Sequence, residues 1–250
     1  MKKPEKHRSR VVQDSVYYAL RRSIINLNLA PGTSISEMEI SQKFQVSRTP
    51  VREAFIHLSV EGLVKVIPQK ETMISLIDLA RVKQEFFLRE SLEIALLEMF
   101  ISNCNEKKIT EMENLITIQS DTLKNKSYID FMNYDDQFHQ ILYEVANQQL
   151  SWEVLSSMSG HYHRVRMLSI LIAGIADEII DEHKKILSAL KEKDLIKSKK
   201  LLYLHMHNLD AEEKILLERF PDYFLPKEVK NTFDVDFGGI PDFRNWGSTE

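Results

Sequence analysis

A chain of 250 residues is long enough for two domains and a sizeable core, and its 43% hydrophobic and 28% charged residues are typical of a globular protein. The single cysteine, Cys104, excludes a framework of intrachain disulfides. No apolar run approaches the roughly 18 residues of a membrane span, and the polar start is not typical of a signal peptide, so we expect a cytoplasmic protein with no membrane partner. Residues 1–74 carry 12 Lys and Arg against 7 Asp and Glu, and the remaining residues carry 21 against 30. This division fits a basic part that meets phosphate and an acidic part that avoids it.

The first part of the chain is predicted to begin with two helices. Apolar residues recur at helical spacing between residues 11 and 29, namely Val12, Val16, Leu20, Ile24 and Leu27. Residues 1–9 are expected to form a mobile arm, and Pro31 and Gly32 end the first helix. A short second helix is predicted over 36–44, and a tight turn follows it.

The stretch 46–54 is typical of a helix start that presents arginines. Ser47 or Thr49 can cap the free amides, and Pro50 suits the first turn. Arg48 and Arg52 lie four residues apart and therefore share one helix face, from which guanidinium groups reach guanine edges or phosphates in a major groove. For this pair alone, an ordinary surface helix with two arginines is the alternative.

The residues that follow predict a small core and a wing. Ala54, Leu58 and Val60 are expected to face the core. After Gly62 the pattern changes to strand alternation, and a return strand over 72–76 follows a turn at 69–71. Two short helices joined by a tight turn and followed by a hairpin predict a winged helix-turn-helix, whose second helix enters the groove.

Four motifs occur in order along this part of the chain, at residues 30–33, 35–37, 46–54 and 61–64. Together they resemble the DNA-binding domain of GntR-family bacterial transcription regulators. The resemblance implies that Arg48 and Arg52 are the main DNA contacts, with Ser47 and Thr49 at the phosphates and the helix start. Glu71 stands at the wing tip where the family usually has glycine, and an acidic side chain there disfavours a contact between the wing and DNA.

Beyond residue 77 the pattern is helical almost throughout. We predict helices at 78–103, 107–124, 127–146, 149–172, 174–192 and 194–219. Short connections between long amphipathic helices predict an antiparallel all-helical bundle, with Asp78 as the first N-cap. The chain thus divides into a winged helix-turn-helix DNA-binding domain at 1–77, a helical domain at 78–226 and a C-terminal tail at 227–250, which either docks on the protein or is disordered.

Candidate metal ligands occur in the predicted bundle. Asp135 and His139 are four residues apart and share one helix face, and His183 and His205 follow on later helices. One carboxylate and three imidazoles that converged would bind a borderline divalent ion such as Zn²⁺, Ni²⁺ or Mn²⁺. The alternative is that each histidine is a hydrogen-bonded core residue, because the sequence alone does not bring them together.

The bundle also resembles a known domain. The similar segments are 89–93, 135–139, 182–190, and 205 followed by 221–224. They resemble the effector-binding FCD domain of the FadR-like subfamily. The resemblance implies a metal that helps to bind a small carboxylate effector, with the ligands Asp135, His139, His183 and His205. It also implies that Arg89 points toward the effector; an intrahelical pair of Arg89 with Glu93 or Glu85 is the alternative.

These patterns predict a ligand-responsive transcription regulator, a repressor rather than an enzyme, that binds double-stranded operator DNA as a homodimer and senses a small organic acid. We expect residues 77–78 and the first bundle helix to couple the two domains. One alternative is an all-helical metal-dependent hydrolase, for which Glu182 is the only obvious base. Another is a metal sensor in which the ion itself is the signal.

Overall fold

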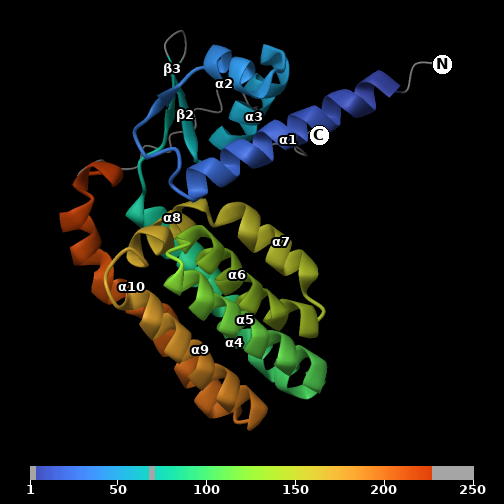
Figure 1. The fold of residues 1–250 in the computed structure, drawn as a ribbon, viewed down its shortest axis with the longest axis vertical. Coiled ribbons are helices and arrows are strands. Elements are labelled where there is room, and N and C mark those ends of the chain that lie inside the picture. Colours follow the sequence, from blue (N-terminus) through green and yellow to red (C-terminus); the bar gives the residue numbers. More distant parts are fainter. Residues whose placement is uncertain (1–3, 68–70, 227–250) are drawn as a thin grey trace, which may run out of the picture.

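The computed structural model describes residues 4–67 and 71–226, which form two parts that lie one above the other in Figure 1. The upper part holds three helices and a small sheet, and the lower part is helical. The expected fold class is confirmed: the chain is mainly α, with an N-terminal winged helix-turn-helix and a C-terminal antiparallel all-helical bundle. Among the residues that the structure describes, no helix is both long and apolar enough to cross a membrane.

The upper part follows the order of a winged helix-turn-helix. Its elements are α1 (Pro4–Ile25), β1 (Ser34–Ile35), α2 (Glu37–Phe44), α3 (Arg48–Val60), β2 (Val64–Ile67) and β3 (Glu71–Ile74). The helix α2 begins at a capping box, in which the Ser36 hydroxyl accepts from the Glu39 amide and the Glu39 carboxylate accepts from the Ser36 amide. It ends at Gln45, whose φ of 54° turns the chain toward α3.

The three strands form one antiparallel sheet in the order β1-β3-β2, in which Ser34 pairs with Met73 and Val64 with Ile74. Strands β2 and β3 are the predicted wing. Strand β1 was not predicted, because its two residues are a strand only through their pairing with β3. The core beneath the sheet consists of buried apolar side chains, among them Val16, Leu20, Ile24, Ile40, Val51, Leu58, Leu63 and Ile74.

Two expectations for these helices were wrong. The helix α1 begins at Pro4, within the stretch expected to be a mobile arm, and it ends at Ile25, before Leu27 with its φ of 61°. Leu58 is fully buried as expected, but Val60 is 83% exposed. Residues two apart on a helix point about 200° apart, so Leu58 and Val60 cannot face the same core.

The bundle contains seven α-helices and a closing turn in its described residues. They are α4 (Leu79–Asn103), α5 (Glu106–Lys124), α6 (Tyr128–Val145), α7 (Gln149–Met158), α8 (Gly160–Ser169), α9 (Ile175–Lys191), α10 (Leu195–Arg219) and η1 (Pro221–Tyr223). Helix α5 packs on α6 and α9, and α4 packs on α6, α8 and α10. The shared core includes Leu97, Phe100, Met112, Phe131, Phe138 and Leu142.

The single helix predicted at 149–172 is instead two helices, α7 and α8, separated at Ser159. The Ser159 hydroxyl donates to the Leu155 carbonyl at 2.6 Å. The next residue, Gly160, lies against Leu63 of the winged helix so closely that an added Cβ would be 2.7 Å from the Leu63 Cδ2. The break therefore coincides with the contact between the two parts of the chain. The spacing of apolar residues along a helix does not predict such a contact.

The junction between the two parts is stabilised by the N-cap of α4 and by hydrogen bonds to the segment that follows α10. Asp78 caps α4, as predicted, by accepting from the amides of Ala80 and Arg81. The Ile77 amide donates to the Tyr223 carbonyl at 2.7 Å, and the Leu225 amide donates to the Ile77 carbonyl at 2.9 Å. The connection is thus paired with the segment that follows α10. The predicted tail at 227–250 lies outside the described residues.

Candidate functional site

The bundle brings the four predicted metal ligands together from three helices. His139 lies on α6, His183 on α9 and His205 on α10, and one ligand atom from each lies within 4.8 Å of the others. The carboxylate of Asp135 is 3.5 Å from Nε2 of His183 and 4.0 Å from Nε2 of His139. Packing of α9 and α10 on each other, and of α4 on both α6 and α10, produces this convergence.

A hydrogen-bond partner orients each of the three imidazoles. Each Nδ1 has an oxygen neighbour: Oε2 of Glu93 at 2.7 Å for His139, Oε1 of Gln119 at 3.0 Å for His183, and Oε2 of Glu182 at 2.8 Å for His205. Because these oxygens accept, each Nδ1 carries the proton and each Nε2 keeps a lone pair. Among the described residues, the buried Nε2 atoms of His139 and His183 have no hydrogen-bond partner. Metal-binding histidines are oriented in the same way.

The protonation states of the histidines and of Asp135 also suit the binding of a cation. Burial lowers the pKa of His139 and holds that of His183 well below its usual range, so both rings are neutral near pH 7. Burial raises the pKa of Asp135, but the charge of Arg166 and the neighbouring histidines outweigh burial and hold it well below its usual range. The cluster therefore offers one carboxylate and the two neutral imidazoles of His139 and His183, donors that borderline divalent ions prefer.

None of the three orienting roles was predicted from the sequence. Glu93 was considered only as a partner of Arg89 and Glu182 only as the base of a hydrolase, and Gln119 was not considered. Glu93 is completely buried, and the charges of Arg89 and His139 outweigh the effect of burial and lower its pKa to about 2. Its four-residue spacing from Arg89 was the one available signal, whereas no spacing or motif indicated Gln119.

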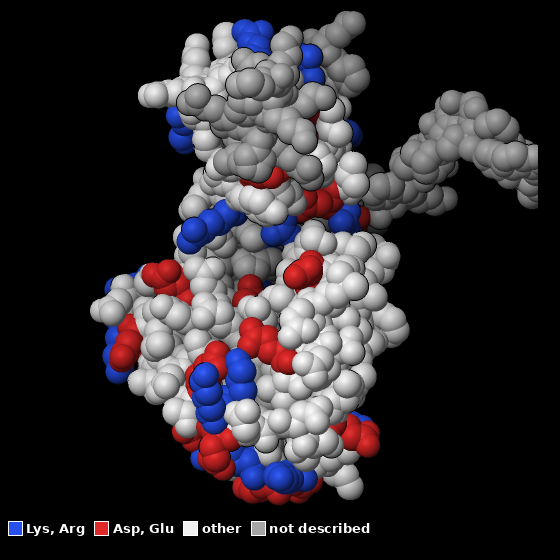
Figure 2. All heavy atoms as spheres, turned by 90° about the vertical axis from the view of Figure 1, so that its right-hand side faces the viewer, with Lys and Arg blue, Asp and Glu red and all other residues white. Residues whose placement is uncertain are grey.

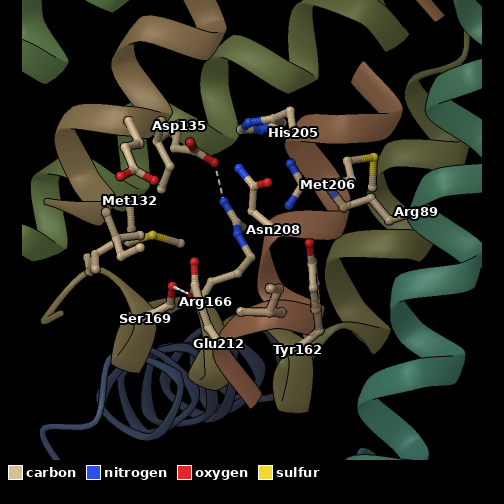
Figure 3. A pocket seen from close by; sticks show the side chains of 15 residues that line it. Arg89, Met132, Asp135, Tyr162, Arg166, Ser169, His205, Met206, Asn208 and Glu212 are labelled. Carbon is tan, nitrogen blue, oxygen red and sulfur yellow. Dashed lines mark hydrogen bonds and ion pairs between the residues drawn. The ribbon is translucent and has the colours of Figure 1, made fainter. Parts of the chain in front are cut away.

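A cavity of about 60 Å³ lies beside the cluster (Figure 3). Asp135 and His205 reach it from the side of the histidines, and Arg89, Tyr162 and Arg166 form another part of its lining. The two guanidinium groups lie 5.7 Å from the centre of the Tyr162 ring. The lining thus combines a candidate metal ligand with positive groups that suit an anion.

Each arginine of the cavity is paired with carboxylates. Arg166 forms ion pairs with Asp135 and, at 2.8 Å, with Asp136. Arg89 donates from Nε to Glu93 at 2.7 Å. The alternative interpretation, a pair with Glu93 within α4, is confirmed. Arg89 also lines the cavity, and its contact with an effector stays a prediction. Arg166 contacts the candidate metal ligand Asp135 directly.

Glu182, the candidate base of a hydrolase, has both of its oxygens engaged. One oxygen accepts from Nδ1 of His205 at 2.8 Å, and the other accepts from the side-chain amide of Asn208 at 2.5 Å. This carboxylate therefore orients a histidine and is not directed at a nucleophile.

The DNA-binding candidates lie on the surface of the winged helix. Ser47, Arg48, Thr49 and Arg52 are all exposed at the start of α3. Ser47 occupies the N-cap position, although its side chain makes no capping hydrogen bond in the described part of the chain. In the view of Figure 2, Lys and Arg side chains lie at the top of the molecule, above a lower region where Asp and Glu also gather.

Helix α8 connects the cavity to the winged helix. Its His161 accepts at Nδ1 from the Asp78 amide at 3.0 Å and lies at Nε2 3.1 Å from the Gly62 carbonyl, just after α3. The buried Arg164 donates to the Ser75 carbonyl at 2.6 Å. Tyr162 and Arg166, on the same helix, line the cavity.

A second contact joins α1 to the bundle. Arg21 donates from Nε to Glu61, at the end of α3, at 2.7 Å. Its Nη2 donates to the Ser156 carbonyl of α7 at 2.6 Å. One guanidinium group of α1 therefore contacts both the end of α3 and the C-terminal end of a bundle helix, where a positive charge is favoured.

Two family models match the chain: "Bacterial regulatory proteins, gntR family" at residues 12–74 and "FCD domain" at residues 85–208. The HTH-type transcriptional repressor RspR of Escherichia coli K12 is 32% identical over 213 residues, which cover 85% of this chain and 93% of RspR. The gluconate operon transcriptional repressor of Bacillus subtilis is 24% identical over 80% of this chain and 83% of its own. The solved structure of Escherichia coli McbR/YncC is similar in fold, with a TM-score of 0.70 and 18% identity over 84% of this chain and 98% of that one.

Proposed function

Since this chain belongs to the GntR family of bacterial transcription regulators and carries an FCD domain, we propose that it is a repressor whose bundle holds a metal and senses a small organic acid. The observation that carries the proposal is the convergence of three imidazoles whose Nδ1 atoms are all engaged by oxygens. Histidines that only fill a core can adopt different orientations. Histidines that bind one metal are oriented alike, with one ring nitrogen bound to an oxygen and the other directed at the ion.

The ligands in this proposal are Asp135, His139, His183 and His205, and the ion is zinc, nickel or manganese. The fit is supported by the two buried Nε2 atoms that have no partner among the described residues. Burying such atoms without a partner is costly, and a cation would compensate for that cost. When bound, the ion supplies a positively charged position for an oxygen of the acid.

A carboxylate ligand is supported by the remaining lining of the cavity. Arg166 now shares its guanidinium between Asp135 and Asp136, so a metal that takes Asp135 leaves donors of Arg166 available for an anion. Arg89 adds a second positive group. The relative named for the gluconate operon supports an organic acid as the class of ligand. A cavity of about 60 Å³ accepts only a small group unless its side chains rearrange.

We assign the coupling between the two parts to α8 together with the 77–78 junction and α4. An acid that displaces Arg166 or Tyr162 acts on the helix that also carries His161 and Arg164. A ligand changes operator affinity only if it binds better to one placement of the winged helices than to the other. In this proposal, the contacts of His161 with Gly62 and of Arg164 with Ser75 are the ones that change between such placements.

On the DNA side, Arg48 and Arg52 read the major groove, and Ser47 and Thr49 contact phosphates near the helix start. We propose a cytoplasmic homodimer, because two winged helices on a two-fold operator bury enough surface for discrimination. Exposed apolar residues at four-residue spacing on α7 support a partner for the bundle, namely Leu150, Val154 and Met158. Sedimentation equilibrium tests this state directly.

Elemental analysis of the purified protein tests the metal. We expect about one transition metal per chain in the wild type and almost none in the variant His183→Ala, His205→Ala. The matched control is His207→Ala, because His207 lies on α10 beside the cluster without belonging to it. Loss of metal from the control alone, or equal metal in all three proteins, contradicts the assignment. A titration of operator affinity with metal in the absence of any acid then separates a cofactor from a metal sensor.

A further inference from the structure

Two side chains on the DNA-binding face are joined before any DNA is present. Arg52 of α3 donates from Nε to one carboxylate oxygen of Glu37 at 2.8 Å and from Nη2 to the other at 2.9 Å. Glu37 stands at the first position of α2, 15 residues earlier in the chain. The Arg52 side chain is nevertheless 65% exposed, so its outer end faces solvent.

The geometry of this pair decides which donors of Arg52 remain. A guanidinium group has five N–H donors, and the carboxylate takes one from Nε and one from Nη2. The donors that remain belong to Nη1 and Nη2 and form the end of the fork. This end matches O6 and N7 of guanine, which accept two parallel hydrogen bonds from arginine.

We infer that Glu37 is a specificity-determining residue, which holds Arg52 by one edge so that the other edge is presented to a guanine. The inference rests on the proposed role of Arg52 in the major groove and is independent of metal, acid and oligomeric state. An arginine that is free in solution must lose side-chain freedom when it binds a base. Arg52 has already lost part of that freedom through two hydrogen bonds.

The pair does little for the stability of the fold, because an ion pair this exposed is largely compensated by solvent and side-chain entropy. Its charge has another effect. The carboxylate of Glu37 repels phosphates and partly neutralises Arg52, so it weakens the attraction to any duplex regardless of sequence. One residue thus favours the base contact and disfavours the backbone contact, and the two effects together increase discrimination.

The test compares two variants that remove one negative charge each from the first turn of α2. Glu37→Gln loses the carboxylate that holds Arg52. Glu39→Gln is the matched control, because Glu39 is exposed, caps Ser36, and can be replaced in a capping box by glutamine. Preferred duplexes are selected from a randomised pool with the wild-type full chain. The guanine read by Arg52 is the position at which Arg52→Ala loses its preference.

For Glu37→Gln, we expect the preference for that guanine over the other bases to fall by at least about fivefold, which is part of the discrimination of one bidentate contact. Affinity for random duplex stays equal or rises. Glu39→Gln keeps the wild-type preference. Unchanged preference in Glu37→Gln with tighter binding to every duplex would show that Glu37 acts only as a repulsive charge, and would overturn the inference.

Two further outcomes are decisive. If Glu37→Gln lowers affinity for all duplexes equally and also lowers the melting temperature, the residue supports the fold and the inference fails. If Arg52→Ala leaves the selected site unchanged, the recognition role of Arg52 fails first and this inference fails with it. A normal Arg52→Ala effect with a silent Glu37→Gln leaves the proposed function intact and overturns only the role of Glu37.

Discussion

The guanidinium of Arg164, which is completely buried, donates to the backbone carbonyl of Ser75 at 2.6 Å. Arg164 belongs to α8 of the bundle, and Ser75 directly follows the last strand of the wing. Burial lowers the pKa of Arg164 to about 10, so the group is still charged near pH 7. A buried charge is expensive, and this one contacts carbonyl oxygens at the domain junction rather than a carboxylate.

We expect Arg164→Met to weaken the contact between the two parts of the chain. The Ser75 carbonyl loses its donor, which costs roughly 1–3 kcal/mol of unfolding free energy, whereas Nδ1 of His161 loses one of two donors and still accepts from the Asp78 amide. Urea unfolding measures the loss, and limited proteolysis near residues 75–78 measures the exposure of the junction. A variant as stable and as resistant as the wild type would show that the contact does not hold the domains together.

The variant Arg166→Met distinguishes the binding of the metal from the binding of the organic acid. Without the guanidinium, Asp135 has one fewer competing cation, so zinc affinity should stay equal or rise, and calorimetry with zinc alone measures it. Binding of carboxylates should be lost, because a bidentate donor is gone. Zinc-loaded protein is scanned against small mono- and dicarboxylic acids by thermal shift. An acid that raises the melting temperature of wild type and variant equally does not use Arg166.

How much of the fold the sequence predicts depends on whether each signal is local. The spacing of Val16, Leu20 and Ile24 predicted α1, because a buried helix face repeats every three or four residues. The break at Ser159 was missed, because the helical spacing of apolar residues was given more weight than the Ser-Gly pair at 159–160, which often marks a turn. It coincides with the contact of Gly160 with Leu63, which is almost 100 residues away in the chain.

The same distinction applies to the candidate site. The spacing of Asp135 and His139 was visible because four residues form one helical turn. His183 and His205 were candidates from their residue type, but only the resemblance to a family favoured their convergence, because convergence depends on how α6, α9 and α10 pack. The role of Gln119 was not predictable, because a buried amide has no characteristic spacing and its contact with His183 is between different helices. The assignment of the metal itself stays a prediction.

Stability should depend on pH through His161. Burial and the charges of Arg164 and Arg81 hold the pKa of His161 well below its usual range, and its Nδ1 accepts from the Asp78 amide. An unfolded histidine titrates near about pH 6.5, so below that pH the unfolded chain binds more protons than the folded one. The free energy of unfolding therefore falls as the pH falls through about 6.5.

Urea unfolding of the wild type and of His161→Asn at about pH 7.5 and 5.5 measures this contribution. The wild type should lose up to about 1.4 kcal/mol more than the variant between the two pH values, because proton uptake by the unfolded histidine over this interval is equivalent to one pKa unit. Other histidines with a lowered pKa, such as the half-buried His163, remain in both proteins and cancel in the difference. Equal losses would mean that His161 keeps its ordinary pKa or is protonated without breaking the junction.

Arg52→Ala should weaken binding to the selected operator by at least about tenfold and leave the fold intact, because the side chain is exposed and its truncation leaves the core unchanged. Arg52→Lys is the informative companion. Lysine keeps the positive charge that attracts phosphates but lacks the planar fork that matches guanine, so random-duplex affinity should persist while discrimination falls. Fluorescence anisotropy at two salt concentrations separates these contributions. If lysine restored both affinity and discrimination, Arg52 would act as a phosphate contact, and the base reading of α3 would have to come from Arg48.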